Sequence, residues 1–133
     1  MLKDDSLPDD ELILRRIPNQ TYFLGNLTNP RINHHNFELE EDEDGVSCNR
    51  ESLMSVEMLL NRPEAIPGSR AARAITSKIR ALGLDIIDVP DVIDPTNVGH
   101  CEIRPRHRND LENKELRKQL ASIFVLIDQH TIS

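Results

Sequence analysis

Ser47, Arg50 and His100 are the residues whose types and spacing could carry out chemistry. Ser47 and Arg50 lie three positions apart just after an acidic run, and His100 lies in a separate stretch at residues 97–103. A serine hydroxyl and a guanidinium group can together hold a phosphate, and a histidine can transfer a proton. If the fold brings these three side chains together, they predict a small enzyme or a nucleotide-binding domain.

Two further arginines, Arg15 and Arg16, could add a second cation to this set. The alternative is structural: Arg50 pairs with the acidic run, and His100 satisfies a backbone carbonyl. The sequence contains neither a Gly-x-Ser-x-Gly motif nor a glycine-rich phosphate loop. We therefore name Ser47, Arg50 and His100 as candidate catalytic residues and favour the structural alternative.

The histidines and cysteines are the residues that could bind a metal. On an extended strand, His34 and Glu38 would share one face while His35 points to the other. A zinc site needs three or four converging ligands, and neither Cys48 nor Cys101 belongs to a Cys-x-x-Cys pair. We expect no metal and no cofactor, with both cysteines acting as small hydrophobic side chains. Cysteine-based catalysis is also disfavoured, because the nearby acids oppose formation of a thiolate.

The acidic run contains six acids within residues 38–44. A calcium loop needs acids at alternating positions around a central glycine, and this run lacks that pattern. Acids so close in sequence repel one another and face water. We interpret the run as a solvated tip that steers a basic partner.

Arg104, Arg106 and Arg108 form the sharpest basic cluster, and Pro105 keeps the segment extended. The cluster could dock an acidic protein surface or clamp the phosphates of a nucleic acid. No aromatic residue accompanies it for base stacking, and the net charge of −7 argues against broad binding to nucleic acid. We predict that these three arginines contact a protein partner.

Periodicity predicts one α+β domain over residues 11–128, between a disordered tail at 1–10 and a short tail at 129–133. Its core is a small mixed or antiparallel sheet with about three helices packed on it. The expected strands are residues 11–18, 35–39, 46–48, 84–89 and 97–103. The expected helices are residues 52–60, 69–82 and 111–128.

Turn and cap residues refine these expectations. A hairpin is expected around residues 41–45, where Asp44-Gly45 is a good turn pair. Ser69 suits the N-cap of the second helix, and Gly83 suits its C-terminal cap. Asn109 or Asp110 could cap the last helix. Residues 19–33 are expected to form a loop.

Several short motifs resemble a family of small, uncharacterised bacterial proteins. They are Arg15-Arg16-Ile17-Pro18, an Asp-Gly-x-Ser-x-x-Arg segment at residues 44–50, a Leu-Gly-Leu strand start at residues 82–84, and Asn-x-x-His at residues 97–100. The resemblance covers residues 11–104, although this chain lacks the proline that follows the asparagine in the family pattern. The resemblance implies a larger partner encoded in the same operon, including operons of antiviral defence or of the toxin type, and it implies no particular reaction.

The function expected from the sequence is therefore a non-enzymatic accessory or interaction subunit that binds a larger protein. The alternatives are the small enzyme described above and a nucleic-acid-binding or antitoxin-like regulator. No apolar run reaches 18 residues, so no membrane partner is expected. The acidic N-terminus lacks the apolar core of a signal peptide, which predicts a cytoplasmic protein.

Overall fold

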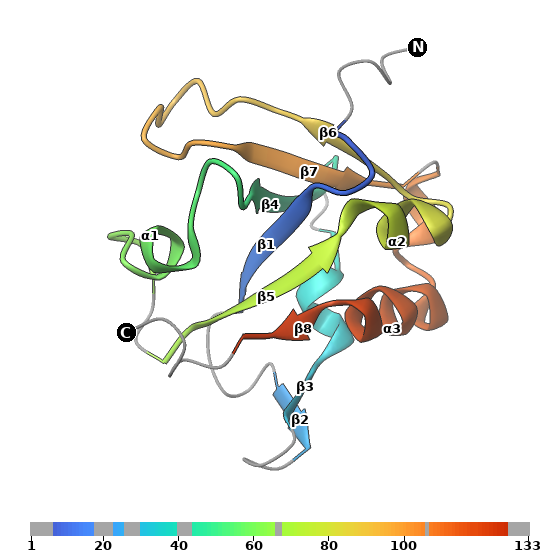
Figure 1. The fold of residues 1–133 in the computed structure, drawn as a ribbon. Coiled ribbons are helices and arrows are strands. Elements are labelled where there is room, and N and C mark those ends of the chain that lie inside the picture. Colours follow the sequence, from blue (N-terminus) through green and yellow to red (C-terminus); the bar gives the residue numbers. More distant parts are fainter. Residues whose placement is uncertain are drawn as a thin grey trace.

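The fold is built on a six-stranded antiparallel sheet, seen in a computed structural model (Figure 1). The structure describes residues 7–17, 23–25, 30–39, 44–65, 68–105 and 107–127. The strand order is β6-β7-β4-β1-β5-β8, and every neighbouring pair is antiparallel. The predicted α+β class with a small sheet and three helices is confirmed. The strands of the sheet are β1 (Leu12–Ile17), β4 (Val46–Arg50), β5 (Arg70–Ile75), β6 (Asp85–Asp88), β7 (His100–Arg104) and β8 (Val125–Leu126).

Helices and a small hairpin complete the structure. A separate two-stranded sheet pairs β2 (Phe23–Gly25) with β3 (Pro30–Ile32), where the sequence predicted only a loop. The α-helices are α1 (Val56–Leu60), α2 (Thr76–Ala81) and α3 (Lys114–Ile123), and two 3₁₀ helices are η3 (His34–Phe37) and η4 (Arg108–Asp110).

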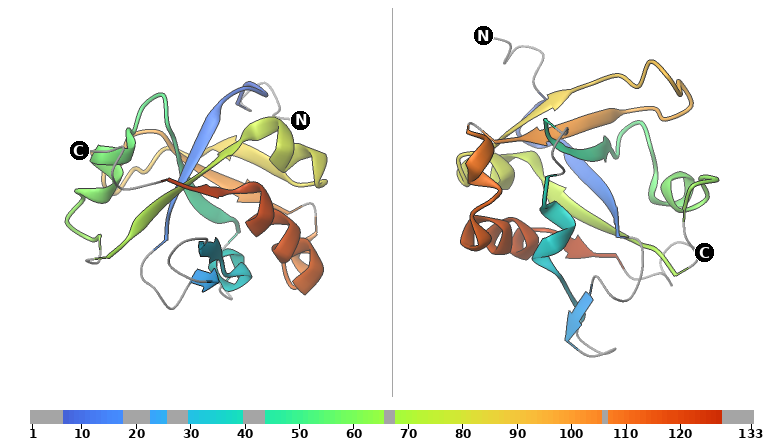
Figure 2. Two further views of the ribbon diagram at one scale, coloured as in Figure 1. Left: turned by 60° about the horizontal axis from the view of Figure 1, so that its bottom comes forward. Right: turned by 180° about the vertical axis from the view of Figure 1, so that it is seen from behind.

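Hydrophobic side chains lie on both faces of the sheet because successive strand residues point to opposite sides. In β1, Ile13 belongs to the main core, whereas the adjacent Leu14 belongs to a second cluster with residues of α1. The main core is covered by α2, α3 and η3, and α1 covers the other face (Figure 2). Leu7, which precedes the predicted domain, is also buried in the main core.

The predicted helix at residues 69–82 is half wrong. Residues 70–75 form β5, which pairs with β1 over six residues, and only Thr76–Ala81 are helical. Ala72 and Ala74 are almost fully buried and belong to the main core, together with Leu120 of α3. Pairing with β1 and this burial outweigh the helix propensity of alanine, which is below about 1 kcal/mol per residue. Gly83 follows α2 with φ +87°, as expected of a C-terminal cap.

The predicted strand at residues 35–39 is wrong, because residues 34–37 form η3 instead. The side chain of Asn33 accepts a hydrogen bond from the backbone N–H of His35 at 3.0 Å and begins the helix. The predicted hairpin tip at residues 40–43 lies outside the described residues. β4 nevertheless pairs with β7 on one side and with β1 on the other. It therefore has no free edge for residues 35–39.

The remaining helices are shorter than predicted. Ser55 caps α1, so that helix begins at Val56. Asn113, and not Asn109 or Asp110, caps α3, and its side chain accepts a hydrogen bond from the N–H of Glu115 at 2.9 Å. After α3 the chain becomes β8, which adds an edge strand next to β5. Within the described parts of the chain, no helix is long and apolar enough to cross a membrane.

Candidate functional site

Ser47 and His100 lie next to each other on the sheet face opposite the main core. β4 and β7 pair so that Asn49 lies opposite His100 and Ser47 lies opposite Glu102. Ser47 and Asn49 are two positions apart in one strand and therefore share a face. The result is a distance of 3.3 Å between Ser47 Oγ and His100 Nε2.

A second hydrogen bond sets the tautomer of His100. Its Nδ1 lies 2.6 Å from the carbonyl oxygen of Val89. Because a carbonyl only accepts, Nδ1 carries the hydrogen, and Nε2 of the neutral ring accepts the hydroxyl hydrogen of Ser47. With Nε2 as the acceptor, His100 could act as the base that activates a serine. In serine hydrolases, however, the Nδ1 hydrogen is donated to a carboxylate, and here it is donated to a backbone carbonyl. The carbonyl bond of His100 is the one that the structural alternative predicts.

Arg50 does not join this pair. It alternates with Asn49 along β4 and therefore points to the other face of the sheet. Its Nη2 donates to Glu11 Oε1 at 3.1 Å, and its Nη1 lies 4.0 Å from Asp88 Oδ1. The grouping of Ser47, Arg50 and His100 expected from the sequence is therefore wrong. Ser47 and Arg50 are an odd number of positions apart in one strand, so their side chains lie on opposite faces of the sheet.

The other two arginines proposed for this set, Arg15 and Arg16, donate hydrogen bonds to backbone carbonyl oxygens. Arg15 donates to the backbone oxygens of Ser47 and Asn36, at 2.5 and 2.8 Å, and so fastens η3 to β4. Arg16 donates to the carbonyl oxygen of Leu59 at 3.3 Å, which fastens β1 to α1. Neither guanidinium is arranged to hold a phosphate at Ser47.

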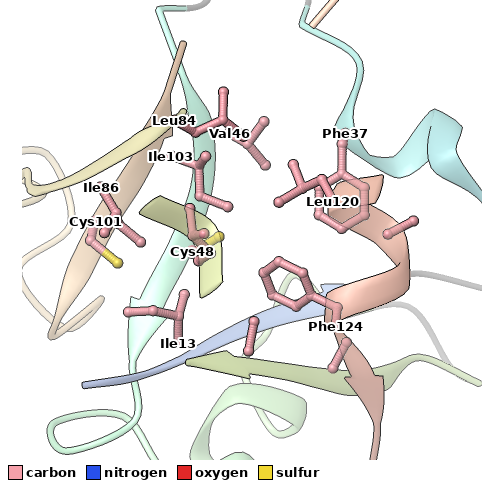
Figure 3. Packing of buried hydrophobic residues seen from close by; sticks show 14 of the residues in the cluster. Ile13, Phe37, Val46, Cys48, Leu84, Ile86, Cys101, Ile103, Leu120 and Phe124 are labelled. Carbon is pink, nitrogen blue, oxygen red and sulfur yellow. The ribbon is translucent and has the colours of Figure 1, made fainter. Parts of the chain in front are cut away.

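The two cysteines lie directly opposite each other in β4 and β7, with both thiols free and buried. Figure 3 shows them among aliphatic side chains that include Ile86 and Ile103. Burial raises the pKa of Cys48 to about 12 and raises the pKa of Cys101 as well. Both thiols are therefore protonated at neutral pH and are poor nucleophiles.

Native protein is expected to resist thiol-specific reagents such as 5,5′-dithiobis(2-nitrobenzoic acid) at neutral pH, and both thiols should react after unfolding in guanidinium. The matched control is Ser47→Cys, which places a thiol on the exposed face beside Cys48. That variant should release one equivalent of chromophore at once. If the unmodified protein reacts as fast as the variant, the cysteines are not enclosed in the core.

The histidine pair is arranged opposite to its predicted placement. His35 Nδ1 lies 2.7 Å from Glu38 Oε1 at the surface, whereas His34 is buried and accepts a hydrogen bond from Arg117 Nε at 3.2 Å. Burial lowers the pKa of His34, which favours the neutral ring. No group of three or more His, Cys, Asp or Glu side chains could hold a metal ion in the described ranges.

The arginine cluster is described only in part. Both Nε and Nη2 of Arg104 donate to one oxygen of Glu102, at 3.0 and 2.9 Å. Arg106 lies outside the described residues, and Arg108 begins η4. The proposed contact between these three arginines and a partner therefore stays a prediction.

A groove of about 470 Å³ runs beside β5 and β8, far from the serine–histidine pair. Its lining is mostly aliphatic, with Arg73 and Lys78 as the cations. Arg73 already makes two hydrogen bonds to the carboxylate of Glu51, at 2.7 and 2.6 Å. Among the described residues Lys78 makes no ion pair, so it is the cation of this groove that is left to a ligand.

The loop that joins β6 to β7 (residues 89–99, the β6–β7 loop) forms a surface that the sequence did not single out. Its adjacent residues Val92 and Ile93 are 89% and 92% exposed. Residues 90–96 lie between two strands expected from the sequence, and no helix or strand was expected there. The available signal was a pair of aliphatic residues enclosed by aspartates and prolines.

Hydrogen bonds order the β6–β7 loop from within. One oxygen of Asp91 accepts the backbone N–H groups of Ile93 and Asp94, at 3.1 and 2.9 Å. Its other oxygen accepts the side-chain amide of Asn97 at 3.1 Å. The N–H of Asp94 is the main cause that lowers the pKa of Asp91, so this carboxylate is ionised at neutral pH. The charged form is the one that holds the loop.

A second set of bonds fixes the β6–β7 loop to the segment after α1. Arg62 Nη2 donates to Asp94 Oδ2 at 2.7 Å, and its Nη1 donates to the carbonyl oxygen of Thr96 at 3.0 Å. At the base of the loop, the Asn49 amide donates to Asn97 Oδ1 and to the Val98 carbonyl oxygen. The loop thus presents Val92 and Ile93 to solvent from a hydrogen-bonded frame.

Comparison of the chain with protein-family models, with curated proteins and with solved structures finds no match.

Proposed function

We propose that this chain is a non-enzymatic interaction subunit that binds a larger protein partner. The observation that carries the proposal is the ordered display of Val92 and Ile93 on the β6–β7 loop. Burial of an aliphatic side chain contributes about 1.5–3 kcal/mol. Val92 and Ile93 can therefore contribute substantially to the binding free energy when a partner covers them.

The order of the loop supports the same function. Binding is weakened when a loop must lose conformational freedom on association, and a preorganised loop avoids most of that cost. Here the bonds of Asp91 and Arg62 hold the loop before any partner arrives. Exposed aliphatic side chains on a rigid support are suited to act as anchors in the centre of an interface.

A serine-based reaction is the second candidate, favoured by the 3.3 Å contact between Ser47 and His100. Catalysis of acyl transfer also needs donors for an oxyanion and a partner that stabilises the imidazolium. In this structure His100 Nδ1 donates to a carbonyl oxygen, and Arg50 points to the other face. The interaction function therefore fits the geometry better.

Replacing both Val92 and Ile93 with serine is expected to abolish capture of the partner. Tagged protein would be incubated with nuclease-treated lysate of the source organism, and retained proteins would be quantified by mass spectrometry. Loss of two anchors should lower affinity at least about thirtyfold, at roughly 1–3 kcal/mol per anchor. The exposed position of both side chains predicts an unchanged circular dichroism spectrum.

Two control variants make the result specific. Val125→Ser changes an aliphatic residue that is 66% exposed in β8, away from the loop, and Ser47→Ala removes the hydroxyl bonded to His100. Both should retain the proteins that the double variant loses. Equal retention by the double variant would contradict the proposal, and selective loss in Ser47→Ala would favour the second candidate.

A further inference from the structure

We infer that the β6–β7 loop and the adjoining residues 51–65, which contain α1 (the α1 segment), form one docking surface. The surface would bind a basic amphipathic segment of a partner protein. This inference rests on the proposed interaction function and adds the chemistry of the partner. Figures 1 and 2 show that the loop and α1 lie at the same end of the sheet. The bonds from Arg62 to Asp94 and Thr96 join the two segments directly.

Exposed aliphatic side chains occur on both segments. Leu53 and Met58 are 51% and 48% exposed, and Val98 at the base of the loop is 37% exposed. Leu53 lies against the loop: a Cβ placed on Gly99 would lie 3.0 Å from the Leu53 Cβ. Together with Val92 and Ile93, these side chains offer apolar contacts to a partner along this end of the molecule.

The charge of the same surface selects a cationic partner. Residues 51–65 and 89–99 contain five acids and one base, Arg62. Two arginines of the neighbouring strands, Arg73 and Arg16, pair with Glu51 and Glu64, so the surface keeps a net charge of −2. Arg62 is already bound to Glu64 and Asp94, at 2.5 and 2.7 Å. Within the described ranges no ion pair involves Glu57 or Asp91. Complementary positive charge would therefore favour association and determine its specificity.

A second copy of this chain fits the surface less well. Its basic stretch at residues 104–118 carries six bases and three acids, a net charge of +3. The described residues of that stretch, however, include no exposed large hydrophobic side chain, since Leu111 is buried. It offers charge without aliphatic anchors. An anionic membrane is disfavoured by the negative charge of the docking surface itself.

The test uses two labelled synthetic peptides of about 18 residues, or five helical turns. Both carry leucines at helical i, i+3, i+4 spacing. The remaining positions are lysine in one peptide and glutamate in the other. Fluorescence anisotropy would measure binding to the full chain at about 0.05 M and 0.5 M salt. The leucine–lysine peptide should bind, more weakly at high salt, and the leucine–glutamate peptide should not.

Four variants locate the binding. Val92→Ser with Ile93→Ser should weaken binding of the leucine–lysine peptide about tenfold or more. Glu57→Lys should weaken it as well, mainly at low salt. Its matched control is Glu115→Lys, because both glutamates are exposed in the first turn of a helix. That control and Val125→Ser should bind as the unmodified protein does.

Each contrary result has a definite meaning. Equal binding of both peptides, or equal effects of Glu57→Lys and Glu115→Lys, would overturn the charge selection. Concentration-dependent dimers that the double serine variant cannot form would assign the surface to a second copy, against this inference. If a host protein depends on Val92 and Ile93 but the leucine–lysine peptide does not bind, the interaction function stands and the basic partner is wrong. If neither binds, both fail.

Discussion

Substitution of Ile79 by aspartate is expected to unfold the domain. Ile79 lies in α2, is fully buried and belongs to the main core. An unpaired charge in such a place costs several kcal/mol or forces the carboxylate to take up a proton. The total stability of a domain is only about 5–15 kcal/mol, so one such change can remove most of it. Thermal denaturation followed by circular dichroism should show a loss of the cooperative transition.

The neighbouring residue provides the control for this change. Lys78→Asp introduces the same carboxylate one position earlier, where the side chain is exposed. Exposed substitutions usually change stability by less than about 0.5 kcal/mol, so its melting curve should stay close to that of the unmodified protein. Were Ile79→Asp to melt at the same temperature as Lys78→Asp, the proposed packing of α2 against the sheet would be refuted.

The second large effect is expected from Arg117→Ala. Arg117 is only 8% exposed, and its Nη1 donates to the carbonyl oxygen of Leu111 at 2.6 Å. Its Nε donates to His34 Nδ1 at 3.2 Å, which joins α3 to η3. Removal would leave two buried acceptors without partners, at about 1–3 kcal/mol each. Urea denaturation should therefore show a free energy of unfolding lower by roughly 2–6 kcal/mol.

Two comparisons separate the contributions of Arg117. Arg117→Met keeps much of the apolar stem but loses the donors, so it should recover only the packing part of the loss. Lys118→Ala truncates an exposed cation at the next position and should have little effect. If Arg117→Ala and Lys118→Ala unfold at the same urea concentration, the buried bonds of Arg117 do not stabilise the fold.

Local pattern was sufficient where a segment's own residues decide its conformation. The strand predicted at residues 11–18 is β1 (Leu12–Ile17), and the one at residues 84–89 is β6 (Asp85–Asp88). Each contains adjacent aliphatic residues and ends one or two residues before a proline, which cannot donate to a sheet. The α+β class followed from the same periodicities.

Pairing between distant segments decided the elements that local pattern missed. Alanine and arginine favour a helix at residues 69–82, but the free edge of β1 takes Arg70–Ile75 as β5. The side chain of Asn33 begins η3 where alternation suggested a strand. Each preference of a single residue is below about 1 kcal/mol, so a set of sheet bonds and buried contacts outweighs it.

The candidate site shows the same division. The residue types alone identified Ser47, Arg50 and His100. The register of β4 against β7 brought Ser47 and His100 together, while the alternation of side chains along β4 turned Arg50 to the other face. The sequence likewise determined that Val92 and Ile93 are aliphatic, a property typical of core residues. Only the tertiary structure shows them exposed, because the bonds of Asp91 and Asp94 hold that loop away from both hydrophobic clusters.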